Sequence, residues 1–118
     1  MPSTFVNGNK VAYAYETIGT MTAATGLTAA NLTQVPTTIG QFDAQRKCDE
    51  VYISVEDADV RVTFDGTTPT VSAGTAAGHL YGHGDTLVIS GFEAISKFRC
   101  INAVAANGAK IRASFFRR

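Results

Sequence analysis

Residues 51–64 read VYISVEDADVRVTF, and this stretch decides the fold class. Apolar and polar side chains alternate through residues 51–56 and again through residues 58–64, with Asp57 between the two runs. A period of two is typical of strands with one buried face. A turn-forming residue between two such runs favours a hairpin. The stretch therefore predicts an antiparallel strand pair in which alternate side chains, such as Ile53, face a core.

Further strands are expected downstream. Residues 86–90 (TLVIS) form a short apolar run that ends at a glycine. Helix is expected only as a single turn that begins in residues 26–30 and around residues 92–97. Residues 98–104 and 109–116 flank Asn107-Gly108, the dipeptide that most strongly favours a hairpin. Short strands at close, regular spacing are typical of a β-sandwich or barrel.

The first 46 residues differ from the rest. They contain four charged side chains and are rich in Thr and Ala, with a strand predicted in residues 11–18. We interpret residues 1–46 as an extended N-terminal segment that either completes the fold or leaves it as an arm. Residues 47–118 then form the core of a single domain. The predicted fold is all-β: an antiparallel β-sandwich or jelly roll with an extended, less regular N-terminal segment.

Composition restricts the function. Ten basic and ten acidic side chains cancel, and charged residues are only 17% of the chain. A nucleic-acid-binding protein needs a positive field, so no nucleic-acid partner is expected. No apolar run is long enough to span a membrane and no signal peptide is recognised, so we expect synthesis in a cytoplasm and no membrane partner. Cys48 and Cys100 are too few for a disulfide framework and are expected to be reduced and partly buried. The alternative, a disulfide between them, requires Cα atoms about 5.5 Å apart.

No catalytic constellation is recognised. On a strand, His79 and His83 would lie about 13 Å apart, too far to bind one metal ion. A turn would bring them closer, but they lack a third ligand and are expected to be exposed turn residues. The acidic residues fall at turns or on outward faces, and Gly82-His83-Gly84 precedes a strand rather than the helix that a phosphate site requires. We therefore expect no enzymatic activity, no cofactor and no metal site.

Aromatic side chains on the predicted outer faces are the best candidates for a binding surface. If Phe115 faces the core, then Phe116 points outward, and Tyr52 likewise lies opposite the buried face of its strand. Tyr13 and Tyr15 share one face of the N-terminal strand, and Phe5 precedes them in the same thinly charged segment. Aromatic residues bury a large area at a small entropic cost, which favours a protein–protein interface. The alternative is that these rings pack in the fold itself.

A set of short stretches is similar to a known group of proteins. These stretches are residues 55–70 (VEDADVRVTFDGTTPT), 78–80 (GHL), 84–87 (GDTL), 98–101 (FRCI) and 113–116 (ASFF), with 15–17 and 26–30 near the start. Over about residues 50–117 the chain resembles small virion structural proteins of tailed bacteriophages and prophages, and it is most similar to head decoration (cement) proteins. The resemblance carries no functional residue across.

The resemblance implies a β-sandwich or jelly roll that forms a homodimer or homotrimer. It also implies binding to the major capsid protein on the exterior of the virion, after synthesis in the host cytoplasm. Two alternatives remain open. One is a phage tail or fibre adaptor. The other is a carbohydrate-binding β-sandwich module, because the turn DGTTPT also occurs in such modules; however, no Trp and only four Tyr offer few rings for stacking on a sugar.

Overall fold

The computed structural model describes residues 10–36, 45–71, 75–105 and 107–118, and these residues are mostly β. Strands account for 46% of them and helices for 9%, and every strand pair is antiparallel. The prediction of an antiparallel all-β fold is confirmed. Within this part of the chain, no helix has the length and hydrophobicity needed to cross a lipid bilayer.

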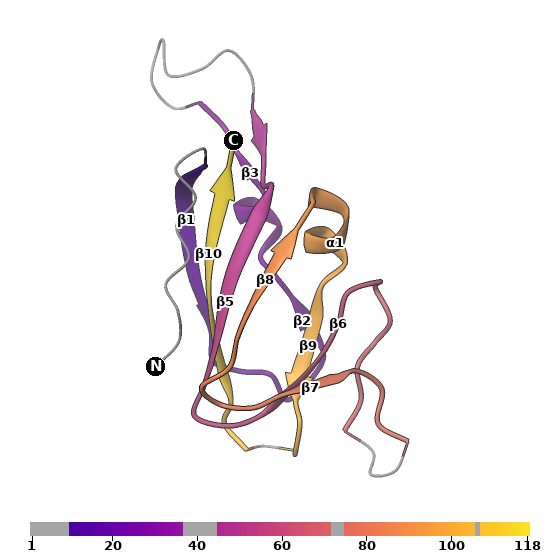
Figure 1. Cartoon of the computed structure of the whole chain (residues 1–118). Helices are drawn as coiled ribbons and strands as arrows, with labels where there is room; N and C mark the ends of the chain where they lie inside the picture. The colour runs from indigo at the N-terminus through magenta and orange to yellow at the C-terminus, as the bar shows by residue number, and fades with distance from the viewer. Residues whose placement is uncertain (1–9, 37–44, 72–74, 106) are drawn as a thin grey trace.

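Four strands make up the first sheet, called here the large sheet. In spatial order they are β1 (Val11–Ile18), β10 (Lys110–Arg117), β5 (Glu50–Glu56) and β8 (Thr86–Ser90). They lie side by side in Figure 1, although β1 and β10 come from opposite ends of the chain.

Four shorter strands make up the second sheet, called here the small sheet. Its order is β2 (Thr25–Gly26), β9 (Arg99–Asn102), β6 (Val60–Thr63) and β7 (His79–Tyr81). A separate two-stranded ribbon joins β3 (Thr33–Gln34) to β4 (Arg46–Lys47), and Figure 1 shows it at the end of the molecule near the C-terminus. The helical elements are the 3₁₀ turn η1 (Ala29–Asn31) and the helix α1 (Phe92–Lys97).

The hydrophobic core draws on both sheets. Alternate residues of β5 and β10, among them Ile53 and Phe115, are fully buried, as their alternation predicts. Val60 and Val62 of β6 join the same cluster from the small sheet, together with Ile95 of α1. Burial of this apolar surface is the main stabilising contribution to the fold.

The predicted hairpin between residues 51–56 and 58–64 is wrong. β5 pairs with β10 and β8 in the large sheet, whereas β6 pairs with β7 and β9 in the small sheet. Asp57, with φ of 71°, forms a tight corner that carries the chain from one sheet to the other. Asp is one of the few residues besides Gly that adopt the left-handed backbone conformation, and this conformation permits the sharp change of direction.

The hairpin expected at Asn107-Gly108 is also wrong, for the same reason. β9 lies in the small sheet and β10 in the large sheet, so this connection likewise joins the two sheets. Gly108 does take the left-handed φ of 78° that the dipeptide favours. In β5 and β10 alternation places the apolar face correctly, but it does not identify the sheet to which a strand belongs.

The described part of the N-terminal segment contributes to both sheets. β1 is the edge strand beside β10, and β2 is the edge strand beside β9. Met21, in the link between these strands, is fully buried in the core. Between residues 10 and 36 the segment therefore completes the sheets.

The two cysteines are free and buried at separate places. The Cys100 thiol lies 3.4 Å from the Met21 sulfur, and burial raises the pKa of Cys100 to about 12. Cys48 donates to the Glu50 carbonyl oxygen at 3.4 Å, and burial raises its pKa as well. A protonated, buried thiol is a weak nucleophile, so both residues act as small apolar side chains in this structure.

Candidate functional site

The outer face of the large sheet brings together residues from four strands. Strand register places Tyr15 of β1 opposite Ser114 of β10, Ser114 opposite Tyr52 of β5, and Tyr52 opposite Val88 of β8. We call these four residues the tyrosine row. Tyr15 is 57% exposed and Val88 is 45% exposed, while Tyr52 is partly buried between them. The row is thus a band of two aromatic rings and one aliphatic side chain across the sheet.

Arg112 fixes one end of the tyrosine row. Its guanidinium donates to Glu56 Oε2 at 2.6 Å, to the Tyr15 hydroxyl at 3.1 Å and to Thr17 Oγ1 at 3.2 Å. Hydrogen bonds with Thr17 and Arg112 lower the pKa of Tyr15, and those with Tyr15 and Glu56 raise the pKa of Arg112. The Tyr15 ring is therefore held in one orientation, which reduces the entropy that it loses on binding a partner.

Tyr13 lies on the other side of β1, so the prediction that it shares a face with Tyr15 is wrong. The register with β10 shifts between Ala12 and Ala14, which marks a β-bulge at Tyr13. The Tyr13 ring packs against the core, and its hydroxyl donates to the Asn31 carbonyl oxygen at 2.6 Å. Burial is also the main cause of its raised pKa. The extra residue reverses the alternation on which the prediction depended.

Phe116 is not exposed, contrary to the prediction that it points into solvent. Its neighbour Phe115 belongs to the core cluster and Phe116 does not, which agrees with opposite faces of β10. Even so, Phe116 is only 8% exposed, and Glu50, its partner in the register with β5, is 3% exposed. The outer face of the large sheet is therefore closed to solvent at Phe116 and Glu50. Phe5, the remaining candidate, lies outside the described residues.

The two histidines have separate surroundings. The His79 ring stacks on Phe64 with centroids 5.8 Å apart, whereas His83 Nδ1 lies 3.2 Å from Asp59 Oδ1. Among the described residues, no group of three or more His, Cys, Asp or Glu side chains is placed to hold a metal ion. The structure therefore does not bring His79 and His83 together as ligands of one site.

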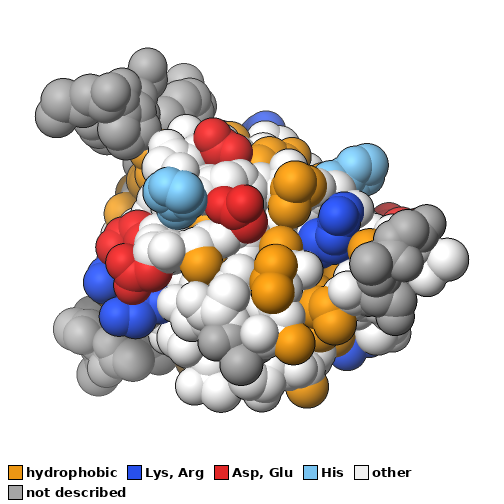
Figure 2. Space-filling view, turned by 90° about the horizontal axis from the view of Figure 1, so that it is seen from below, with side chains coloured by type: hydrophobic (Ala, Val, Ile, Leu, Met, Phe, Trp, Pro, Cys, Tyr) orange, Lys and Arg blue, Asp and Glu red, His pale blue; other side chains and the backbone are white. Residues whose placement is uncertain are grey.

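The acidic side chains from Glu50 to Glu93 each have a partner in the structure. These pairs are Glu50 with Lys10, Glu56 with Arg112, Asp57 with Lys110, Asp59 with His83, Asp65 with the Thr67 amide, Asp85 with the Gly82 amide, and Glu93 with Lys97. Figure 2 views the molecule from below Figure 1, and it shows several acidic side chains gathered beside a histidine at the lower end of the molecule. Hydrogen bonds to His83 lower the pKa of Asp59. These groups stabilise turns and strand ends.

Sequence reasoning identified Tyr15 and Tyr52 but missed the rest of the surface. Val88 lies between two buried residues in an apolar run, and only the period of two marks it as outward-facing. Arg112 alternates with buried residues in β10, which places it on the same face. The order of the strands, which makes these residues neighbours, has no local signal in the sequence.

Comparison with known proteins gives no relative: no family model, no curated protein and no solved structure matches this chain.

Proposed function

We propose that the fold is a jelly roll, which is one specific kind of antiparallel all-β fold. When the eight strands of the two four-stranded sheets are numbered in chain order, the large sheet has the order 1-8-3-6 and the small sheet 2-7-4-5. A jelly roll consists of two four-stranded sheets wound from two Greek keys. The repeated crossing between sheets, including the corner at Asp57, supports this assignment. Jelly rolls are used in viral capsid proteins and in lectins, among others.

We further propose that the protein is a virion structural protein that decorates the head of a tailed phage. In this role it binds the major capsid protein on the capsid exterior and stabilises the shell as a homodimer or homotrimer. The observation that carries the proposal is the tyrosine row, a band across the outer face of the large sheet whose two ends, Tyr15 and Val88, are exposed. The resemblance to small virion proteins and the low charge of the chain support the same role.

The chemistry of the tyrosine row suits docking onto a protein surface. Tyr15 and Tyr52 each offer a large rigid ring with a hydroxyl at its rim, a combination favoured at interfaces. Val88 extends the apolar band to the opposite edge of the sheet. A stable contact buries on the order of 1,000 to 2,000 Å² in total, and a shell with many copies accumulates the gain from each contact.

Alanine at Tyr15 and at Tyr52 is expected to weaken docking about tenfold for each substitution, because each removes a ring that would be buried at the interface. The measurement is the dissociation constant of the purified protein for empty heads assembled from the major capsid protein of the same phage. Thermal unfolding of each variant shows that the fold is retained.

The matched control is Leu80→Ala. Leu80 is 56% exposed, but it lies in β7 of the small sheet, away from the tyrosine row. The affinity of the Leu80→Ala variant for the heads should equal that of the unaltered protein. Equal affinities for the two tyrosine variants and the unaltered protein would exclude the large sheet as the docking face.

A further inference from the structure

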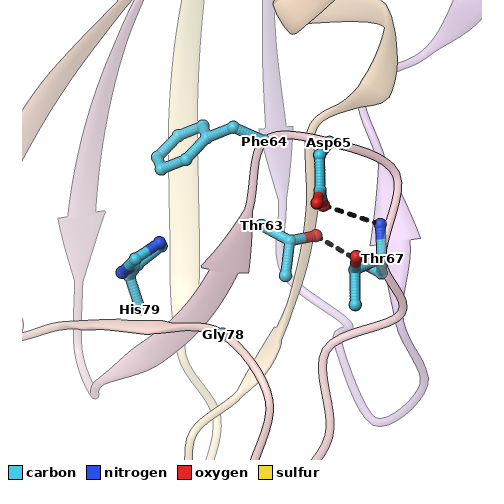
Figure 3. A pocket seen from close by; sticks show the side chains of 6 residues that line it. All are labelled: Thr63, Phe64, Asp65, Thr67, Gly78 and His79. Carbon is cyan, nitrogen blue, oxygen red and sulfur yellow. Dashed lines mark hydrogen bonds between the residues drawn. The ribbon is translucent and has the colours of Figure 1, made fainter.

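A second surface feature lies at the end of the small sheet, away from the tyrosine row. It is an open hollow of about 390 Å³ lined by Thr63, Phe64, Asp65, Thr67, Gly78 and His79. The volume falls within the range of small-ligand sites, roughly 300 to 1,000 Å³. Figure 3 shows the rings of Phe64 and His79 on one side and the side chains of Thr63, Asp65 and Thr67 on the other.

The aromatic side of the hollow is held in place by packing. Phe64 stacks on His79 at an interplanar angle of 28° and lies 6.1 Å, centroid to centroid, from the buried Phe98. His79 is exposed at the start of β7. Gly78 precedes it with φ of 115°, and a Cβ there would lie 3.2 Å from the Val62 carbonyl oxygen. The chain is therefore fixed against β6 at the residue that positions His79.

The polar side of the hollow is a tight turn. Asp65 Oδ1 accepts a hydrogen bond from the Thr67 amide at 3.0 Å, and the Thr63 hydroxyl donates to the Thr67 carbonyl oxygen. Hydrogen bonds from Thr67 lower the pKa of Asp65, so this exposed carboxylate is ionised at neutral pH. An ionised carboxylate only accepts hydrogen bonds. A ligand in the hollow must therefore supply donors, and hydroxyl groups meet this need.

The combination of rings and carboxylate selects one ligand chemistry. The C–H groups of a sugar ring carry partial positive charge and pack favourably on the negative face of an aromatic ring. The Asp65 carboxylate, whose charge the nearby Lys97 ammonium group partly offsets, disfavours a phosphate or carboxylate in direct contact with it. A purely apolar ligand would desolvate Asp65 without replacing its hydrogen bonds. We propose that this hollow binds one pyranose unit of a neutral glycan, stacked on the exposed His79 ring, which Phe64 supports from behind, with its hydroxyl groups donating to Asp65.

This site is independent of the proposed capsid role. The hollow belongs to the end of β6 and the start of β7, whereas the tyrosine row crosses the large sheet. A copy docked through the tyrosine row would leave the hollow available for a glycan. Sugar binding is measured on the purified protein alone, so a failure of one proposal is distinguishable from a failure of the other.

The test is a nuclear magnetic resonance titration of the ¹⁵N-labelled protein with glucose, galactose, mannose and N-acetylglucosamine, separately. We expect at least one sugar to bind with a dissociation constant in the millimolar range, as suits a ligand of this size. The amide shifts should centre on residues 63–67 and 78–79. Glucuronic acid, the anionic counterpart of glucose, should bind more weakly than glucose.

Variants identify the residues responsible. His79→Ala and Asp65→Asn should each weaken sugar binding about tenfold, and the asparagine retains the acceptor for the Thr67 amide. His83→Ala removes the other exposed histidine, which does not line the hollow, and should bind like the unaltered protein. Absence of binding by all four sugars at saturating concentrations, shifts centred elsewhere, or equal binding of glucuronic acid would each overturn the proposal.

Discussion

Alanine in place of Phe115 is expected to lower the free energy of unfolding by about 3 to 5 kcal/mol. Phe115 is fully buried in the central part of β10, where it pairs with Val51 of β5 and Ala14 of β1. Its removal loses the transfer free energy of the ring and leaves a cavity that rigid sheet neighbours fill only in part. Since domains of this size are stable by only about 5 to 15 kcal/mol, the loss is large.

Chemical denaturation at pH 7 measures this effect, and Phe92→Ala is the matched control. Phe92 undergoes the same chemical change at the start of α1, but it is partly exposed and its ring lies under the Lys47 ammonium group at 5.1 Å. The free energy of unfolding should fall by less than half as much for Phe92→Ala as for Phe115→Ala. A loss at Phe115 no larger than that at Phe92 would contradict the placement of the core between the two sheets.

Methionine in place of Lys10 should lower the free energy of unfolding by about 1 to 3 kcal/mol. The Lys10 ammonium group lies 2.8 Å from Asp49 Oδ2 and 3.0 Å from Glu50 Oε2. The Glu50 side chain is almost completely buried, so the substitution leaves its carboxylate without this cation. Methionine retains the length and apolar character of the lysine stem, which limits the change to the charge.

The double variant Lys10→Met/Glu50→Gln provides the control, because a neutral amide tolerates burial without a cation. It should recover most of the lost stability. Equal stability of Lys10→Met and the unaltered protein at pH 7, or no recovery in the double variant, would contradict the assigned role of the ion pair.

The contribution of Lys10 should depend on pH in a defined direction. Its hydrogen bonds with Asp49 and Glu50 raise the pKa of Lys10, and the hydrogen bond from Lys10 lowers the pKa of Asp49 below 3.8. Stability linked to a lowered carboxyl pKa is present above the unfolded value and is lost as the pH falls through the folded value. The difference between the protein and Lys10→Met should therefore be constant from about pH 5 to 9 and shrink below about pH 4.

The sequence allowed the positions of most strands to be predicted, but not their partners. Alternation in residues 51–56 and 58–64 correctly identified the buried valines and isoleucine, Val51, Ile53, Val55, Val60 and Val62, whereas Thr63, which the pattern placed outward, is buried as well. The same alternation fits a hairpin and a corner between sheets equally well, because each places an apolar face against a core. Distinguishing them depends on contacts between distant segments, such as β1 with β10, that no local pattern encodes.

The candidate surface was predictable to a similar degree. Tyr15 and Tyr52 could be placed on outer faces, yet their proximity requires β10 between their strands with Ser114 in register with both. The bulge at Tyr13 and the covering of Phe116 could not be foreseen, since one inserted residue or one packed neighbour cancels the rule of alternation. The hollow beside His79 depends on a turn from residues 65–67 meeting β7, again a long-range arrangement.

We propose that this protein docks on a phage head through the outer face of the large sheet. The decisive measurement is cryo-electron microscopy of purified particles, with the density of this protein identified in the map. We expect a copy number close to that of the major capsid subunit, with Tyr15, Tyr52 and Val88 against the shell and the small sheet facing outward. A handful of copies in the tail, or attachment to the shell through the small sheet, would contradict it.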